Sequence, residues 1–129
     1  MNLESPKVTV QKSNKEIFDF LSNTENFEKI MPENIDKFEA GENTFKFALK
    51  GMPELRLNVE EQESPKKLVL GSASDKLPFT LTANIEENSE TSSNVQLVFD
   101  GKINPMMAMM VKKPLQKFLN ALSENIQKR

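Results

Sequence analysis

The feature that most constrains the fold of this 129-residue chain is a change of hydrophobic period along its length. Between residues 35 and 103, apolar and polar residues alternate in segments separated by short polar turns. A period of two is typical of β-strands that bury one face and expose the other, and five or six such strands predict an antiparallel meander. The predicted inward residues are Phe45, Phe47, Leu49, Leu55, Leu57, Val59, Leu77, Phe79, Leu81, Ala83, Ile85, Val95, Leu97 and Phe99.

The segment after the meander has the helical period and predicts the element that covers the sheet. Asn104 is a candidate N-cap, and Pro105 stands at the first helical position, where its missing N–H costs nothing. Apolar residues then recur at helical spacing, at Val111, Leu115, Phe118, Leu122 and Ile126. Pro114 removes the hydrogen bond to the carbonyl of Met110, so we expect the helix to kink or to end one segment there.

The N-terminal part predicts one short strand and two short helices. VTVQ, residues 8–11, alternates as a strand, and Ser13 and Glu16 have the spacing of a capping box at the start of a helix. Thr24 is expected to cap a second short helix, which Pro32 ends.

Composition excludes several kinds of partner and site. The 17 basic and 19 acidic residues form no basic stripe, so we expect neither a nucleic-acid partner nor attraction to an anionic membrane. No apolar run approaches the ~20 residues of a membrane span, and no signal peptide is recognisable, so we expect a cytoplasmic protein. Without Cys or His there is no thiolate or imidazole ligand. A hard-cation site made only of carboxylates is the alternative, but the sequence has no D-x-D-x-D-G type loop, so we expect no metal and no cofactor. One domain over residues 1–129 is the simplest organisation.

Three stretches together resemble the helix-grip fold of the SRPBCC, or START-like, superfamily. They are KSNKEIFDFLSNTENFEKIMPENIDKFEA, the meander, and NPMMAMMVKKPLQKFLNALSENI. This superfamily includes lipid-transfer START domains, the birch-pollen-allergen family, aromatic polyketide cyclases and ubiquinone-binding relatives, and the chain looks most like its small, uncharacterised bacterial members. The resemblance implies an α+β fold, with a curved antiparallel sheet of six or seven strands around a long C-terminal helix and two short helices after the first strand. It also implies an apolar tunnel between the sheet and that helix.

The apolar inner face favours a non-enzymatic carrier or sensor of a small hydrophobic molecule, such as a lipid, an isoprenoid or an aromatic compound. For most inward residues the alternative is that they simply fill a core. The residues expected to line a cavity are Phe47, Leu57, Leu70, Ser72, Phe79, Leu81, Leu97, Phe99, Met107, Met110, Val111 and Phe118. Ser72 faces this space only if Leu68 and Leu70 point inward; if Val69 does, no polar group enters it.

Four of the seven methionines stand within five residues at the start of the predicted helix. Helical geometry places Met107 on the core side, and Met106, Met109 and Met110 on the side that carries Lys113. Because methionine adapts to irregular space, these side chains either fill a gap, form a pliable cavity mouth or present a patch to a partner. The patch gives the alternative function, a homodimer or a partner-protein contact through Met106, Met109 and Met110.

A third hypothesis is a cyclase-like or hydrolytic enzyme, as in some members of the superfamily that the chain resembles. Such an enzyme needs a placed acid, base or nucleophile with a shifted pKa. The regular strands offer none on their predicted inner face, which leaves Ser72, Ser74 and Asp75 in the stretch GSASDK. Lys112 and Lys113 are expected to be surface charges, although an acidic ligand head would also meet them.

Overall fold

The computed structural model describes residues 1–50, 52, 54–72 and 78–129. Its elements in chain order are β1 Asn2–Glu4, β2 Val8–Val10, α1 Asn14–Ser22, the 3-10 turn η1 Thr24–Asn26, α2 Phe27–Ile30, β3 Ile35–Gly41, β4 Thr44–Leu49, β5 Leu55–Glu63, β6 Lys67–Ser72, β7 Phe79–Ser89, β8 Ser92–Gly101 and α3 Pro105–Gln127.

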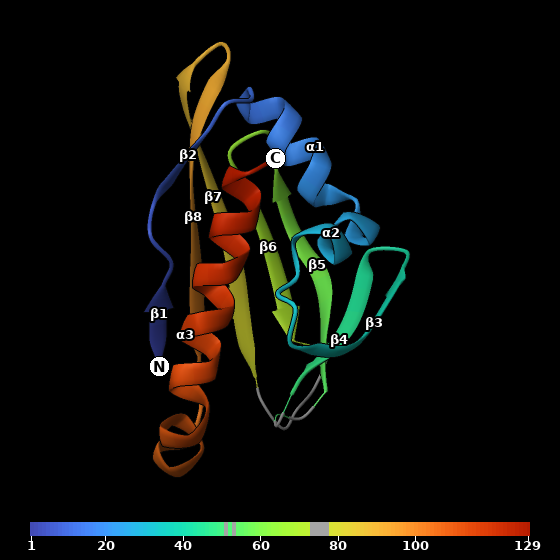
Figure 1. Ribbon diagram of the computed structural model, residues 1–129, viewed down its shortest axis with the longest axis vertical. Coiled ribbons are helices and arrows are strands. Elements are labelled where there is room, and N and C mark those ends of the chain that lie inside the picture. Colours follow the sequence, from blue (N-terminus) through green and yellow to red (C-terminus); the bar gives the residue numbers. More distant parts are fainter. Residues whose placement is uncertain (51, 53, 73–77) are drawn as a thin grey trace.

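In the described residues, the strands form one curved, unclosed antiparallel sheet of eight strands. The sheet follows the order β1-β8-β7-β6-β5-β4-β3, and β2 also pairs with β8. The long helix α3 runs along one face, and α1 and α2 cover the same face near the C-terminal end of α3 (Figure 1). The predicted α+β helix-grip fold is confirmed. The sheet exceeds the expected six or seven strands because two short N-terminal strands, β1 and β2, pair with different parts of β8.

The meander buries the face that its alternation predicts. The described inward residues are buried in one apolar cluster with α3, except Val59, which is half-buried; Leu77 lies outside the described residues. β7 and β8 pair along almost their whole length, from Phe79 opposite Gly101 to Ser89 opposite Ser92. A one-residue slip of such a pairing would turn every buried side chain to the outer face, so burial fixes the register.

The helix α3 begins where its sequence predicts and continues past Pro114. The Asn104 side-chain oxygen accepts the N–H of Met107 at 2.8 Å, and Pro105 occupies the first turn. A kink or the end of a helical segment was expected at Pro114, and the helix does not end there. Val111 before it and Leu115 after it are both buried against the sheet, and this burial holds the helix together where one hydrogen bond is missing. Within the described residues, no helix combines the length and the apolar character needed to cross a bilayer.

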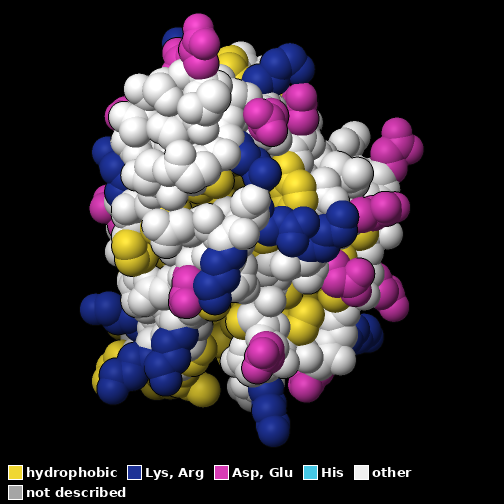
Figure 2. Space-filling model, turned by 45° about the horizontal axis from the view of Figure 1, so that its top comes forward, with side chains coloured by type: hydrophobic (Ala, Val, Ile, Leu, Met, Phe, Trp, Pro, Cys, Tyr) yellow, Lys and Arg dark blue, Asp and Glu magenta, His cyan; other side chains and the backbone are white. Residues whose placement is uncertain are grey.

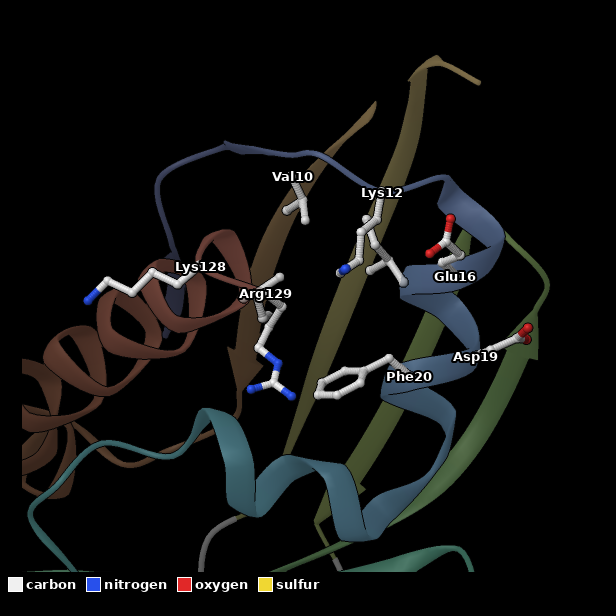
Figure 3. Close-up of a pocket in the computed structure, with 9 residues that line it drawn as sticks. Val10, Lys12, Glu16, Asp19, Phe20, Lys128 and Arg129 are labelled. Atoms are coloured by element: carbon white, nitrogen blue, oxygen red, sulfur yellow. The ribbon is translucent and has the colours of Figure 1, made fainter. Parts of the chain in front are cut away.

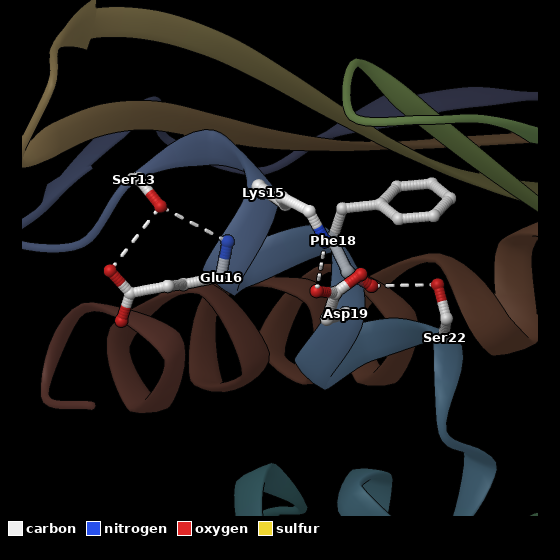
Figure 4. A network of polar contacts seen from close by, with 6 residues as sticks. All are labelled: Ser13, Lys15, Glu16, Phe18, Asp19 and Ser22. Atoms are coloured by element: carbon white, nitrogen blue, oxygen red, sulfur yellow. Dashed lines mark hydrogen bonds and ion pairs between the residues drawn. The ribbon is translucent and has the colours of Figure 1, made fainter.

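Ser13 caps the start of α1, as its spacing to Glu16 predicts. The Ser13 hydroxyl accepts the Glu16 N–H at 3.2 Å and donates to the Glu16 carboxylate at 3.3 Å (Figure 4). One turn further, Lys15 pairs with Asp19 at 3.0 Å. On the same helix, Phe18 is buried.

The predicted role of Thr24 as a helix cap is wrong. The Asn23 side chain instead accepts the Glu25 N–H at 3.2 Å at the start of η1. Thr24 is buried, and its hydroxyl donates to the carbonyl of Gly41 at 2.7 Å. This long-range bond ties the short helices to the end of β3, a contact that local spacing does not reveal.

Candidate functional site

The interior between the sheet and α3 is almost filled by side chains. Among the described side chains lie two enclosed voids of about 10 Å³ each. Leu21, Phe27, Ile30, Leu70, Leu81, Ala83, Leu97, Leu122 and Ile126 line the first. Phe47, Leu55, Leu57, Phe79, Leu81, Phe99, Leu115, Phe118 and Leu119 line the second. Each is at the lower limit of the room that one water molecule needs. Among the described residues, these small voids therefore stand where the resemblance implies an open tunnel.

Most residues expected to line a cavity lie around these two voids. Phe47, Leu57, Phe79, Leu81, Phe99 and Phe118 surround the second, and Leu70 and Leu97 join Leu81 at the first. Val111 is buried, Met107 is half-buried against the core, and the Met110 side chain is 70% exposed. As ligand contacts, all of these residues remain predictions.

β6 has the first of its two expected orientations, the one in which Leu68 and Leu70 point inward. Leu68 and Leu70 belong to the core cluster, while Gly71 faces outward, against the side chain of Glu60. By alternation Ser72 shares the inner face, and it is half-buried opposite Leu57 in the sheet register. The other candidates for catalysis, Ser74 and Asp75, lie outside the described residues.

A groove of about 480 Å³ opens beside α3, next to the segment that joins α2 to β3. Pro32, Asn34, Leu49, Lys50, Lys113, Pro114, Lys117, Phe118 and Ala121 line it, and we call it the lysine groove. The Lys50 N–H donates to the Asn34 carbonyl at 3.0 Å, which joins the end of β4 to the opposite wall. Further along α3, the Asn125 side chain donates to the Ile30 carbonyl at 2.8 Å. One backbone bond and one side-chain bond thus connect β4 and α3 to the stretch that begins at the end of α2 and leads into β3.

Phe118 lies between the lysine groove and the second void, because its side chain lines both. The ring is only 6% exposed and stacks on Phe47, with 5.0 Å between centroids. Phe118 is the described residue that the two linings share.

The lysine groove is positively charged at its rim and apolar at its floor. As far as the chain is described, its lining contains Lys50, Lys113 and Lys117 and no Asp or Glu. All three lysines are exposed, and none forms an ion pair with any residue that the structure describes. The buried side chains of Leu49 and Phe118 contribute to the lining beneath them. This arrangement suits a ligand that is anionic at one end and apolar at the other.

A second groove, of about 630 Å³, lies between α1 and the C-terminal end of α3 (Figure 3). Arg129 projects toward the ring of Phe20, with its guanidinium carbon 5.0 Å from the ring centroid. Lys12 and Lys128 share the lining with Glu16 and Asp19. Because charges of both signs line this groove, it lacks the one-signed character of the lysine groove.

The first turns of α3 expose three methionines, as their helical positions predict. Met106, Met109 and Met110 are 77%, 85% and 70% exposed, and we call them the methionine patch. Figure 2 shows hydrophobic side chains beside Lys or Arg side chains at this end of the molecule. Single exposed apolar residues are ordinary, whereas three on neighbouring turns are typical of a contact surface.

Within the described residues, the group with a clear pKa shift is Glu39, which lies away from both the interior and the grooves. Lys46 donates a hydrogen bond to Glu39 across β3 and β4 at 2.9 Å, and this bond and the lysine charge lower the pKa of the Glu39 carboxyl. The pair projects from the solvent-facing side of the sheet. No group of three or more acidic side chains in the described residues is placed to hold a metal ion.

Sequence signals for the lysine groove were weak. Its residues come from three separate segments, residues 32–34, 49–50 and 113–121, and no spacing within one segment joins them. Lys113 was expected to be a surface charge with an acidic ligand head as the alternative, but Lys50 and Lys117 carried no signal. Only the tertiary fold brings the three together.

Comparison with known proteins gives the fold and not a function. No family model matches the chain, and no curated protein matches its sequence. A START superfamily protein from Mycobacterium smegmatis superimposes with a TM-score of 0.70 at 14% identity, covering 98% of this chain and 97% of its own. Norcoclaurine synthase from Thalictrum flavum, in complex with dopamine and hydroxybenzaldehyde, superimposes with a TM-score of 0.72 at 12% identity. The match covers 99% of this chain and 84% of the synthase chain. An uncharacterised protein from Bacillus thuringiensis gives 0.67 at 11% identity and covers 98% of both chains. The chain therefore has the helix-grip fold of START-like proteins.

Proposed function

We propose that the protein binds a small hydrophobic molecule that enters through the lysine groove and lodges between α3 and the sheet. The observation that carries this proposal is the position of Phe118, which separates a groove of about 480 Å³ from an apolar void. Ligand sites are concave, mostly apolar and about 300–1,000 Å³ in volume. Norcoclaurine synthase, which shares the fold, holds two small aromatic molecules, and this supports the proposal by analogy.

Binding in the interior requires the Phe118 ring to move, because the voids themselves are too small for a guest. Moving the ring forfeits its stacking on Phe47, and such pairs contribute about 0.5–1.5 kcal/mol beyond their buried area. A guest that fills the vacated space recovers apolar contact of comparable size. The cost of opening is therefore small enough for a ligand to offset.

A neutral fluorescent dye such as Nile red tests this route with two variants. Phe118→Ala removes the ring between groove and void, so we expect the dye to bind several-fold faster than to the wild type. Phe18→Ala deletes another buried ring, on α1, that lines neither the groove nor either void. It serves as the control for general loosening of the core.

Stopped-flow fluorescence measures the two rates. Equal acceleration in both variants would show that the dye enters through a loosened core and not past Phe118. If neither the wild type nor Phe118→Ala bound the dye, and native mass spectrometry of gently extracted protein found no bound small molecule, the proposed function would be wrong.

The methionine patch supports a second candidate function, contact with another protein. Its exposed side chains lie on the helix face that continues to Lys113, and Lys102 and Lys112 flank the patch in the sequence. A two-fold contact through the patch brings these lysines toward their own copies, where like charges repel. An acidic partner surface fits the patch better than a second copy of the chain.

Light scattering and pull-down with Met109→Lys test the second function. We expect a monomer in both forms, and loss of any captured acidic partner in the variant only. Asn120→Lys adds the same charge at an exposed position further along α3 and is the control. A wild-type dimer that Met109→Lys dissociates would favour self-association instead.

A further inference from the structure

We infer that the ligand of the lysine groove is an amphiphile with one anionic head, held by Lys50, Lys113 and Lys117, and an apolar chain directed toward Phe118. This inference rests on the proposed function, because it names the chemical class that the same groove takes. Its ground is the separate observation that charge and apolar surface are divided between the rim and the floor of the groove.

The charge at the rim is a local exception in a net-negative molecule. The chain carries a net charge of −2, yet the residues that the structure describes around the lysine groove include three lysines and no acid. The lysines come from two places in the fold, Lys50 from the turn directly after β4 and the other two from successive turns of α3. An anion in the groove thus meets positive charge from both walls.

These lysines are available to a ligand. The four ion pairs of the described residues involve Lys15, Lys37, Lys46 and Lys128, and none involves a lysine of the groove. Unpaired ammonium groups lose little when a carboxylate or phosphate replaces water at the rim. Each exposed pair contributes about 0.2–1 kcal/mol, so two or three together give roughly tenfold in affinity.

The apolar floor of the lysine groove favours a ligand with an aliphatic or aromatic chain over a small inorganic anion. Below the lysines the lining consists of Leu49, Pro114, Phe118 and Ala121, together with Pro32 on the opposite wall. Most of these groups offer only carbon to a ligand, and free phosphate gains nothing from them. A chain attached to the anion buries its apolar surface there and gains about 25 cal/mol for each Å².

The groove at the C-terminal end of α3 does not share this selectivity. Glu16 and Asp19 line it beside its cations, so an anion there meets repulsion as well as attraction. Lys128 also pairs with Glu124 at 3.4 Å. The lysine groove is therefore the anion-selective one of these two.

Three ligands with the same chain and different heads test the inference: dodecanoate, dodecyl phosphate and dodecanol. Calorimetric titration below their aggregation concentrations compares the wild type with the double variant Lys113→Gln/Lys117→Gln. Lys112→Gln is the matched control, because Lys112 is exposed on the same turn of α3 and does not line the groove. Circular dichroism of each variant confirms that the exposed substitutions leave the fold intact.

We expect at least one of the two anions to bind the wild type about tenfold more tightly than dodecanol. The double variant should lose this advantage and keep its affinity for dodecanol, and Lys112→Gln should behave as the wild type. Preference for the carboxylate over the phosphate would point to a free fatty acid, and the reverse to a phosphate-headed lipid. Both results support the inference.

Two results would overturn the inference, and they are distinguishable. If dodecanol bound the wild type as tightly as both anions, the anionic head would be wrong while the proposed apolar ligand survived. If the anions kept their advantage in the double variant, the lysines would not be their site. Failure of all three ligands to bind would remove the proposed function together with the inference.

Discussion

At the scale of single residues, a few long-range side-chain bonds hold the walls of the candidate site. Thr24 bonds to Gly41, and Asn125 on α3 bonds to the Ile30 carbonyl at 2.8 Å and the Met31 carbonyl at 3.4 Å. The Asn125 bonds satisfy two carbonyls at the C-terminal end of α2, where helices leave such groups without partners. One amide therefore positions the segment that leads into the lysine groove.

Replacing Asn125 by alanine should lower the free energy of unfolding by about 1–2 kcal/mol, the usual cost of losing such hydrogen bonds. Asn120→Ala is the control, since Asn120 is exposed on the same helix and its side chain accepts a bond from Gln116 at 3.0 Å, within α3 itself. Both substitutions gain the same helix propensity, so their difference isolates the contact with α2. Urea denaturation measures it, and equal stabilities would show that Asn125 does not hold α2 in place.

At the scale of elements, three successive parts of α3 make different contributions to the molecule. Its first turns expose the methionine patch, its middle turns supply Lys113, Lys117 and Phe118 to the groove, and its last turns anchor α2. Pro114 sits between the first two regions and lines the groove. Its retention in a continuous helix has a cost in stability that packing must offset.

We expect Pro114→Ala to stabilise the protein by about 1–3 kcal/mol. Alanine restores an N–H for the Met110 carbonyl, and proline is ~3 kcal/mol less favourable than alanine inside a helix. Thermal or urea unfolding measures the gain, with Lys112→Ala as a surface control. Unchanged or lower stability would mean that the proline ring contributes packing in the groove equal to the helical bond.

At the scale of the whole molecule, the sequence predicts the shell better than the interior. Alternation identified which strand faces are buried, and Asn104 with Pro105 marked the start of α3, because these features depend on near neighbours. The distance between sheet and helix depends on how Phe47, Phe118 and Leu81 interdigitate, which no periodicity reports. The sequence therefore could not predict that small voids lie among the described side chains where a tunnel is expected. The lysine groove likewise depends on the tertiary fold, which brings its separate segments together.

A nearly filled interior predicts that the protein folds fully without a guest. Calorimetry of protein stripped with organic solvent should show one cooperative transition, with a heat-capacity change of about 1.5–1.9 kcal/mol/K for 129 residues. The midpoint should match that of protein that has not been stripped. A large fall on stripping would instead show that a resident molecule forms part of the core.

The stacked phenylalanines have a further consequence for fluorescence measurements on this protein. Rings of Phe27, Phe45, Phe47 and Phe118 form a row from α2 across β4 to α3, with successive centroids 4.5, 6.0 and 5.0 Å apart. The chain contains no Trp and no Tyr, so its own emission is faint and nothing masks an added indole. A tryptophan placed at the groove end of this row, as Phe118→Trp, would be the only strong emitter, and its colour would report directly whether water or a guest lies against it.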